Sequence, residues 1–163
     1  MSYKNKTYII FDADNDMKHY RLMTAWKKND KIDFNFHDAH ELNNLRDGSS
    51  EETIKRKLRE RMNNTKQAVV LVGDSTKDLY KYVRWEIEIA INMDIPIIAV
   101  NLNKSNQAHS NTPPILKNNA YFVSVPFEVK KVKYALDNFP TEYSKSKNKA
   151  PSSRTYNWDN RQL

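Results

Sequence analysis

Two glutamates in the most hydrophobic stretch of the chain are its strongest candidates for chemistry. Glu86 and Glu88 lie within residues 80–100, which read as an amphipathic helix followed by a buried strand. At about 100° per residue, Val83 falls in the apolar stripe of this helix and Glu88 projects toward water. Glu86 falls at the border of the stripe. It is either a structural carboxylate, paired with a cation or a backbone N–H group, or a carboxylate presented to a ligand.

The composition excludes several other kinds of site. The 163 residues include only two glycines, Gly48 and Gly73, so no glycine-rich phosphate loop can form. There is no cysteine, which excludes disulfides and thiolate catalysis. His37 and His40 share a polar loop, but two further ligands are not evident, and we predict no metal site.

The charge pattern argues against nucleic acid and membrane partners. The net charge of +7 is spread over the chain, as on a solvated surface, so nucleic-acid binding is not expected. No apolar run approaches the roughly 18 residues of a membrane span, and the start does not read as a signal peptide. We therefore expect a cytoplasmic protein.

The order of apolar runs predicts a three-layer α/β domain. Strands are predicted at residues 6–11, 32–36, 67–73, 95–100 and 120–125. Helices are predicted at residues 17–29, 51–62, from about 80, and 129–138, with Ser50 capping the second. This alternation implies a five-stranded parallel sheet covered by helices on both faces. The domain is expected to span residues 1–140, followed by a basic tail at 141–163.

A parallel sheet of this kind also predicts where a ligand binds. Ligands of open α/β sheets bind outside the carboxyl ends of the strands, where the strand order reverses. The loops that reach this edge are residues 12–16, 37–48, 74–78 and 101–114.

Four segments resemble a TIR domain, and more closely the TIR-like family of bacterial Thoeris anti-phage systems. They are TYIIFDADND, FNFHDAHEL, VVLVGDST and YVRWEIEIA, and the resemblance covers roughly residues 6–140. It implies a flavodoxin-like, TIR-like fold. In the last segment, Glu86 falls where the family has its catalytic glutamate.

The resemblance implies cleavage of the nicotinamide–ribose bond of NAD⁺, which is the substrate, with no cofactor. The leaving pyridinium is already cationic, so no general acid is needed. The ribose carbon becomes oxocarbenium-like, and the Glu86 carboxylate would stabilise its charge. The product would be a diffusible cyclic ADP-ribose-type messenger read by a separate effector protein, and the enzyme would be active after an infection cue or self-assembly.

Six further residues are candidates for binding this substrate: Phe11, Asp12, Ala13, Asp38, Ser75 and Tyr82. The ring of Phe11 can stack on the ligand or belong to the core, and Tyr82 can line the site or cover the core. Asp38 can bond a ribose hydroxyl or cap a turn. Backbone N–H groups around residues 12–13 and 74–76 can cradle phosphate.

Three other functions are found on folds with this order of elements. A response-regulator receiver has acids after the first strand and at the end of the third, as Asp12 and Asp74 do. It also needs a lysine after the fifth strand, where Val125 and Pro126 stand. A flavodoxin would not place the acidic segment DADND beside a phosphate. A non-catalytic TIR-like module that signals by protein–protein contact is the main alternative to the enzyme.

Overall fold

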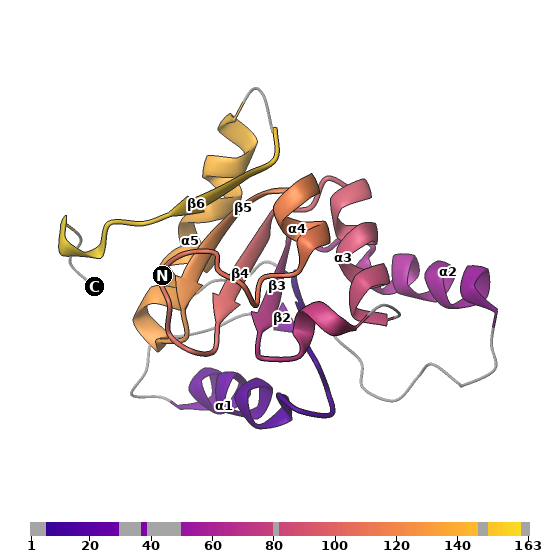
Figure 1. Cartoon of the computed structure of the whole chain (residues 1–163), viewed down its shortest axis with the longest axis horizontal. Coiled ribbons are helices and arrows are strands. Elements are labelled where there is room, and N and C mark those ends of the chain that lie inside the picture. The colour runs from indigo at the N-terminus through magenta and orange to yellow at the C-terminus, as the bar shows by residue number, and fades with distance from the viewer. Residues whose placement is uncertain (1–5, 30–36, 39–49, 80–81, 147–149, 161–163) are drawn as a thin grey trace.

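The computed structural model describes residues 6–29, 37–38, 50–79, 82–146 and 150–160 (Figure 1). Within them, six parallel strands form one sheet in the order β2-β1-β3-β4-β5-β6. The strands are β1 (Lys6–Ile10), β2 (His37–Asp38), β3 (Gln67–Val72), β4 (Ile97–Asn101), β5 (Tyr121–Pro126) and β6 (Ser152–Thr155). The predicted α/β class with a parallel sheet is confirmed, and the sheet has one more strand than predicted. The strand expected at residues 32–36 lies outside the described residues.

Helices cover both faces of this sheet. They are α1 (Met17–Lys28), α2 (Glu51–Met62), α3 (Tyr82–Asn92), α4 (Pro114–Asn119) and α5 (Val129–Lys145), with 3₁₀ turns η1 (Thr76–Asp78) and η2 (Trp158–Asn160). Ser50 caps α2 as predicted, because its side chain accepts a hydrogen bond from the Thr53 N–H group. The chain passes from β1 to β2 in one direction and to β3 in the other, so the strand order reverses at β1.

Alternation along β1 divides the core into two layers. Tyr8 and Ile10 point into the layer under α2, α3 and α4, while Ile9 and Phe11 point into the layer under α1 and α5. Both layers are fully buried at β1, which has paired strands on each side. Side chains two residues apart in β1 can therefore reach the same layer, whereas neighbours cannot.

Helix α1 lies beside the carboxyl ends of the strands, below the strand arrows in Figure 1. Its Trp26 ring packs against Phe127, directly after β5, with centroids 4.7 Å apart. Its Tyr20 ring stacks on Phe11, directly after β1, at 4.6 Å. Aromatic contacts thus fix α1 against the edge at which a ligand of this fold would bind.

The end of the chain differs from the prediction. The last helix was expected to stop at residue 138, before Pro140, but α5 continues through Pro140 to Lys145. Phe139 and Tyr143 lie four residues apart on its buried face, and their burial outweighs the hydrogen bond that proline cannot make. The boundary predicted at residue 140 therefore falls inside α5, and part of the predicted tail forms β6. Helix α4 was not predicted either, although a proline such as Pro114 in the first turn is a known signal for the start of a helix.

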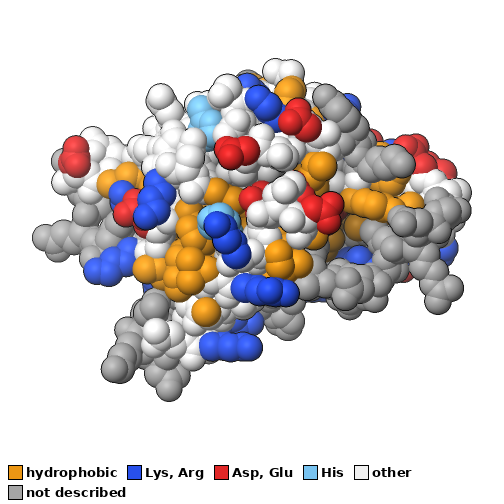
Figure 2. All heavy atoms as spheres, turned by 60° about the horizontal axis from the view of Figure 1, so that its bottom comes forward, with side chains coloured by type: hydrophobic (Ala, Val, Ile, Leu, Met, Phe, Trp, Pro, Cys, Tyr) orange, Lys and Arg blue, Asp and Glu red, His pale blue; other side chains and the backbone are white. Residues whose placement is uncertain are grey.

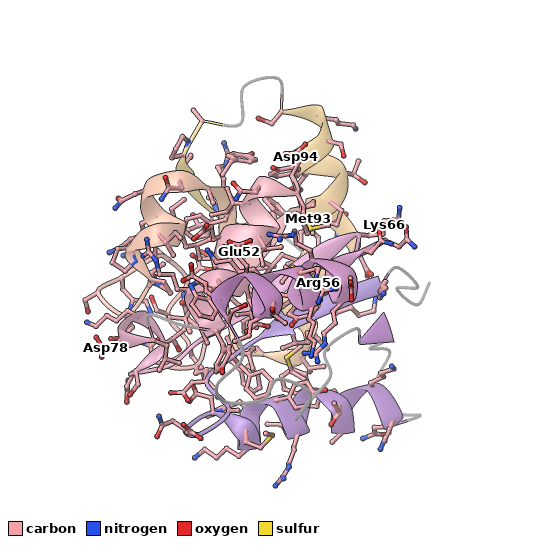
Figure 3. All side chains as sticks on the ribbon, turned by 90° about the vertical axis from the view of Figure 1, so that its right-hand side faces the viewer. Glu52, Arg56, Lys66, Asp78, Met93 and Asp94 are labelled. Carbon is pink, nitrogen blue, oxygen red and sulfur yellow. The ribbon has the colours of Figure 1, made fainter. Side chains whose placement is uncertain are left out.

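The extension of α5 predicts a measurable contribution from Tyr143. Its hydroxyl donates to Asp94 Oδ1 at 2.6 Å, at the turn after α3 that Figure 3 shows beside α5. Tyr143→Phe keeps the ring and removes this bond, so we expect the free energy of unfolding to fall by about 1 to 2 kcal/mol in urea titrations. Ser144→Ala, one position along on the exposed side, is the control and should have little effect. Equal stability of Tyr143→Phe and wild type would contradict the assignment.

Candidate active site

Glu86 is built into the sheet side of α3. Val83, Ile87 and Ala90 are buried against the sheet, as the helical projection predicts, and Ile89 is buried as well. The Glu86 side chain itself is only 5% exposed, beneath the layer that α2 covers. Of the two alternatives for Glu86, a structural carboxylate and one presented to a ligand, this burial agrees with the first.

The Glu86 carboxyl has two polar neighbours from other elements. The hydroxyl of Tyr8, in the middle of β1, and the Arg61 guanidinium, in the last turn of α2, are its polar neighbours and act on its ionisation. Burial raises the pKa of the Glu86 carboxyl from 4.5 to about 8, although Tyr8 and Arg61 each act to lower it. Burial therefore favours the protonated form of Glu86 in this conformation.

Glu88 does not join Glu86 in an acid pair. Its carboxylate lies 3.6 Å from Lys55 Nζ on α2 and is about one third exposed, 38% of its side chain. Lys55 also lies over the Trp85 ring, 5.7 Å from its centroid. The prediction that the two acids point in different directions is confirmed, and Glu88 links the outer surfaces of α2 and α3.

The loop after β1 is organised by Asp12. Its carboxylate is 2% exposed and accepts hydrogen bonds from the N–H groups of Asp14, at 3.0 Å, and Asn15, at 3.3 Å. The Asn15 side-chain amide donates to it at 2.6 Å. These bonds use the N–H groups of residues 14 and 15, whereas the predicted phosphate cradle uses those around residues 12–13 and stays a prediction.

Asp16 is a site residue that the sequence did not single out. It is the residue before α1, yet its side chain does not cap the helix. The carboxylate instead lies on Gly73, where an added Cβ would be 2.7 Å from its Oδ1 atom. Its Oδ2 atom is buried and has no partner among the described residues. Burial, followed by the charge of Asp12, raises the pKa of the Asp16 carboxyl. The signal available in the sequence was Gly73, because a glycine that ends a buried strand can admit a close neighbour.

The β4–α4 loop, residues 102–113, completes this edge. The Asn111 amide donates to Asp74 Oδ1 at 3.3 Å, and Lys77 Nζ donates to the Ser110 carbonyl at 3.1 Å. Figure 2 turns the edge toward the reader and shows acidic and basic side chains mixed over it. The loops after β3 and β4 are therefore fastened to each other at the carboxyl edge.

The other predicted binding residues do not converge on one point. Phe11 is buried under Tyr20, in the opposite core layer from Glu86. Tyr82 lies against Trp85 on α3, with ring centroids 5.7 Å apart. Ala13 is exposed beside Asp12, and Ser75 is half-buried at the start of η1, both at the carboxyl edge.

Some predicted residues lie beyond what the structure describes. The backbone of His37 and Asp38 forms β2, but their side chains lie outside the described part, as does all of His40. Within the described ranges, no group of three or more His, Asp or Glu side chains could hold a metal ion. No helix in those ranges is both long and apolar enough to cross a bilayer.

The strand order, the two helical layers and the carboxyl-edge loops define a flavodoxin-like α/β domain of the TIR-like type. The family described as Thoeris protein ThsB, TIR-like domain, matches residues 8–107, from β1 into the β4–α4 loop. The chain belongs to this family, because the match covers more than half of its 163 residues. It is thus a defence-related TIR-like domain, and Glu86 falls inside the matched region.

The buried carboxyl of Glu86 predicts how stability depends on pH. Its pKa is 4.5 ordinarily and about 8 in the fold, so the folded state holds a proton that the unfolded state releases. The stability linked to that proton is complete below pH 4.5 and is lost as the pH rises through about 8. Glu86→Gln, which stays neutral, should flatten this dependence in denaturant titrations over the same range. An unchanged slope would contradict the burial described above.

Proposed function

We propose that this protein cleaves the nicotinamide–ribose bond of NAD⁺ and that Glu86 is its catalytic residue. The observation that carries the proposal is the position of this carboxyl. It lies on α3, in the region matched to the TIR-like family, within the layer next to β1 where the strand order reverses. Ligands of doubly wound sheets bind beyond that point, at the carboxyl ends of the strands.

One carboxylate suffices for this reaction. Nicotinamide leaves as a neutral molecule from a cationic pyridinium, so no side chain has to protonate it. The positive charge moves onto the ribose carbon, and an adjacent carboxylate stabilises that charge in the transition state. This requirement fits a site in which Glu86 and Glu88 do not act as a pair.

The reaction requires a change at Glu86. In the conformation described, the carboxyl is buried, which favours its protonated form, and a protonated acid cannot stabilise an oxocarbenium ion. Binding of a cationic pyridinium nearby would favour the ionised form, because an opposite charge lowers the pKa of a carboxyl. Substrate binding would therefore both uncover and ionise Glu86.

The fate of the sugar completes the proposal. If water is excluded, a nucleophile on the adenosine part of the same molecule attacks the ribose carbon and closes a ring. The product is then a cyclic ADP-ribose-type messenger for a separate effector protein of the defence system. Exclusion of water is what separates cyclisation from simple hydrolysis.

A second function is favoured by a specific observation. Glu86 is buried with the Tyr8 hydroxyl and the Arg61 charge as its polar neighbours, as expected for a structural buried acid. On this reading the domain is a non-catalytic TIR-like module that signals by protein–protein contact.

Two assays separate these functions. Purified protein incubated with NAD⁺ should release nicotinamide, and Glu86→Gln should lower the rate by about 100-fold or more. Glu88→Gln, on the same helix, is the matched control and should keep nearly the wild-type rate. In phage-challenged cells, a folded Glu86→Gln variant should lose protection. Protection that survives in this variant would exclude Glu86 as the catalytic residue and favour the signalling module.

A further inference from the structure

The C-terminal strap, residues 152–158, adds an element that the sequence did not predict. Its strand β6 pairs with β5, from Tyr121↔Ser152 to Ser124↔Thr155, at the sheet edge shown in Figure 1. Three of the four β6 side chains are exposed, so the strand itself buries little apolar surface. The strap is therefore held by the backbone pairing of β6 with β5 and by the side chains that follow β6.

Two aromatic residues anchor the strap to α5. Tyr156 is buried against the Tyr134 ring at 5.0 Å, and its hydroxyl donates to Glu142 Oε2 at 2.7 Å. Trp158 packs on Tyr134 at 5.6 Å and on Tyr156 at 5.2 Å. These contacts place the Trp158 indole N–H group at the end of the strap nearest the carboxyl edge.

Asn106 connects the strap to the β4–α4 loop. Trp158 Nε1 donates to Asn106 Oδ1 at 2.6 Å, and Asn106 Nδ2 donates to the Tyr156 carbonyl at 3.1 Å. Both polar atoms of the Asn106 side-chain amide therefore form hydrogen bonds with the strap. An amide bonded at both ends fixes the distance and the orientation of the two segments together.

The loop is also tied to the end of β4, because the Asn101 side-chain amide donates to the Ser105 carbonyl at 2.9 Å and to the Gln107 carbonyl at 3.1 Å. No apolar side chain is found between Leu102 and Ala108, where the sequence is Asn-Lys-Ser-Asn-Gln. Lys104 has a φ of 66°, which costs energy for a residue other than glycine and needs support from its surroundings. On its far side the loop is fastened to the β3–α3 loop by the bonds of Asn111 to Asp74 and of Lys77 to Ser110.

We propose that the C-terminal strap is a positioning element for the candidate site, in which Trp158 and Asn106 hold the β4–α4 loop against the β3–α3 loop at the carboxyl edge. The strap does not touch the reacting atoms. It acts through a loop whose other end contacts the segment leading into α3, the helix of Glu86. The role of the strap in holding the loop does not depend on catalysis, whereas its effect on turnover rests on the proposed function.

Hydrogen exchange of the full-length protein tests the structural part. Amides in the loop are protected by bonds of their own, such as Leu102 N–H to the Val72 carbonyl and Lys104 N–H to the Asn101 carbonyl. Trp158→Phe keeps an aromatic ring but removes the indole donor and part of the ring packing, so exchange in residues 102–107 should accelerate about fivefold or more. Asn106→Leu, which removes both bonds, should accelerate it further. Lys133→Met, which breaks an exposed bond to Asp137 within α5, is the control and should leave the loop unchanged.

Two exchange results would overturn the inference. One is wild-type exchange in residues 102–107 of both strap variants. The other is an even acceleration over β1, β3 and β4, which would mark a general loss of stability rather than a local release. If the wild-type protein cleaves NAD⁺, Trp158→Phe should raise KM more than it lowers kcat, and an unchanged KM would overturn the link to the site. If the wild-type protein does not cleave NAD⁺ and the folded Glu86→Gln variant still protects phage-challenged cells, the proposed function fails and the exchange result alone decides the role of the strap.

Discussion

The burial of one ionisable carboxyl is the constraint on which the functional interpretation depends. A glutamate buried away from water is unstable as an anion, so burial raises the pKa of Glu86. Tyr8 and Arg61 lie beside it and partly oppose this shift. The three side chains come from α3, β1 and α2, so any movement of Glu86 changes the packing between these elements. A structural acid and a catalytic acid in a resting state look alike in this respect. They differ in whether a bound ligand can move the carboxylate from the core layer into contact with itself.

At the carboxyl edge, too, carboxylates contact groups of the protein itself rather than being free to bind a ligand. Asp12 binds the N–H groups of its own loop, and Asp16 lies on Gly73 rather than capping α1. These carboxylates oppose a phosphate at this position. A ligand with both a cationic and an anionic part would therefore be expected to place its anionic part elsewhere along the edge.

Most of the fold could be predicted from the sequence, because its elements depend on local patterns. Continuous apolar runs identified β3, β4 and β5, and the spacing of Ile54, Leu58 and Met62 identified α2. The end of the chain could not be predicted in this way. Pro140 argues locally for a helix end, whereas the tertiary burial of Tyr143 continues the helix. β6 has no apolar pattern of its own, since its partner β5 and the anchors Tyr156 and Trp158 define it.

The site was predictable only in part, for a related reason. Helical periodicity gave the directions of Glu86 and Glu88 relative to the sheet, but burial depends on α2, which contributes from a distant part of the sequence. The central claim is that NAD⁺ draws Glu86 out of this layer, and a crystal structure with a non-hydrolysable NAD⁺ analogue tests it most directly. The account predicts the Glu86 carboxylate within hydrogen-bonding distance of a ribose hydroxyl and moved away from Tyr8 and Arg61. A bound analogue with Glu86 still buried beside Tyr8 and Arg61 would contradict it.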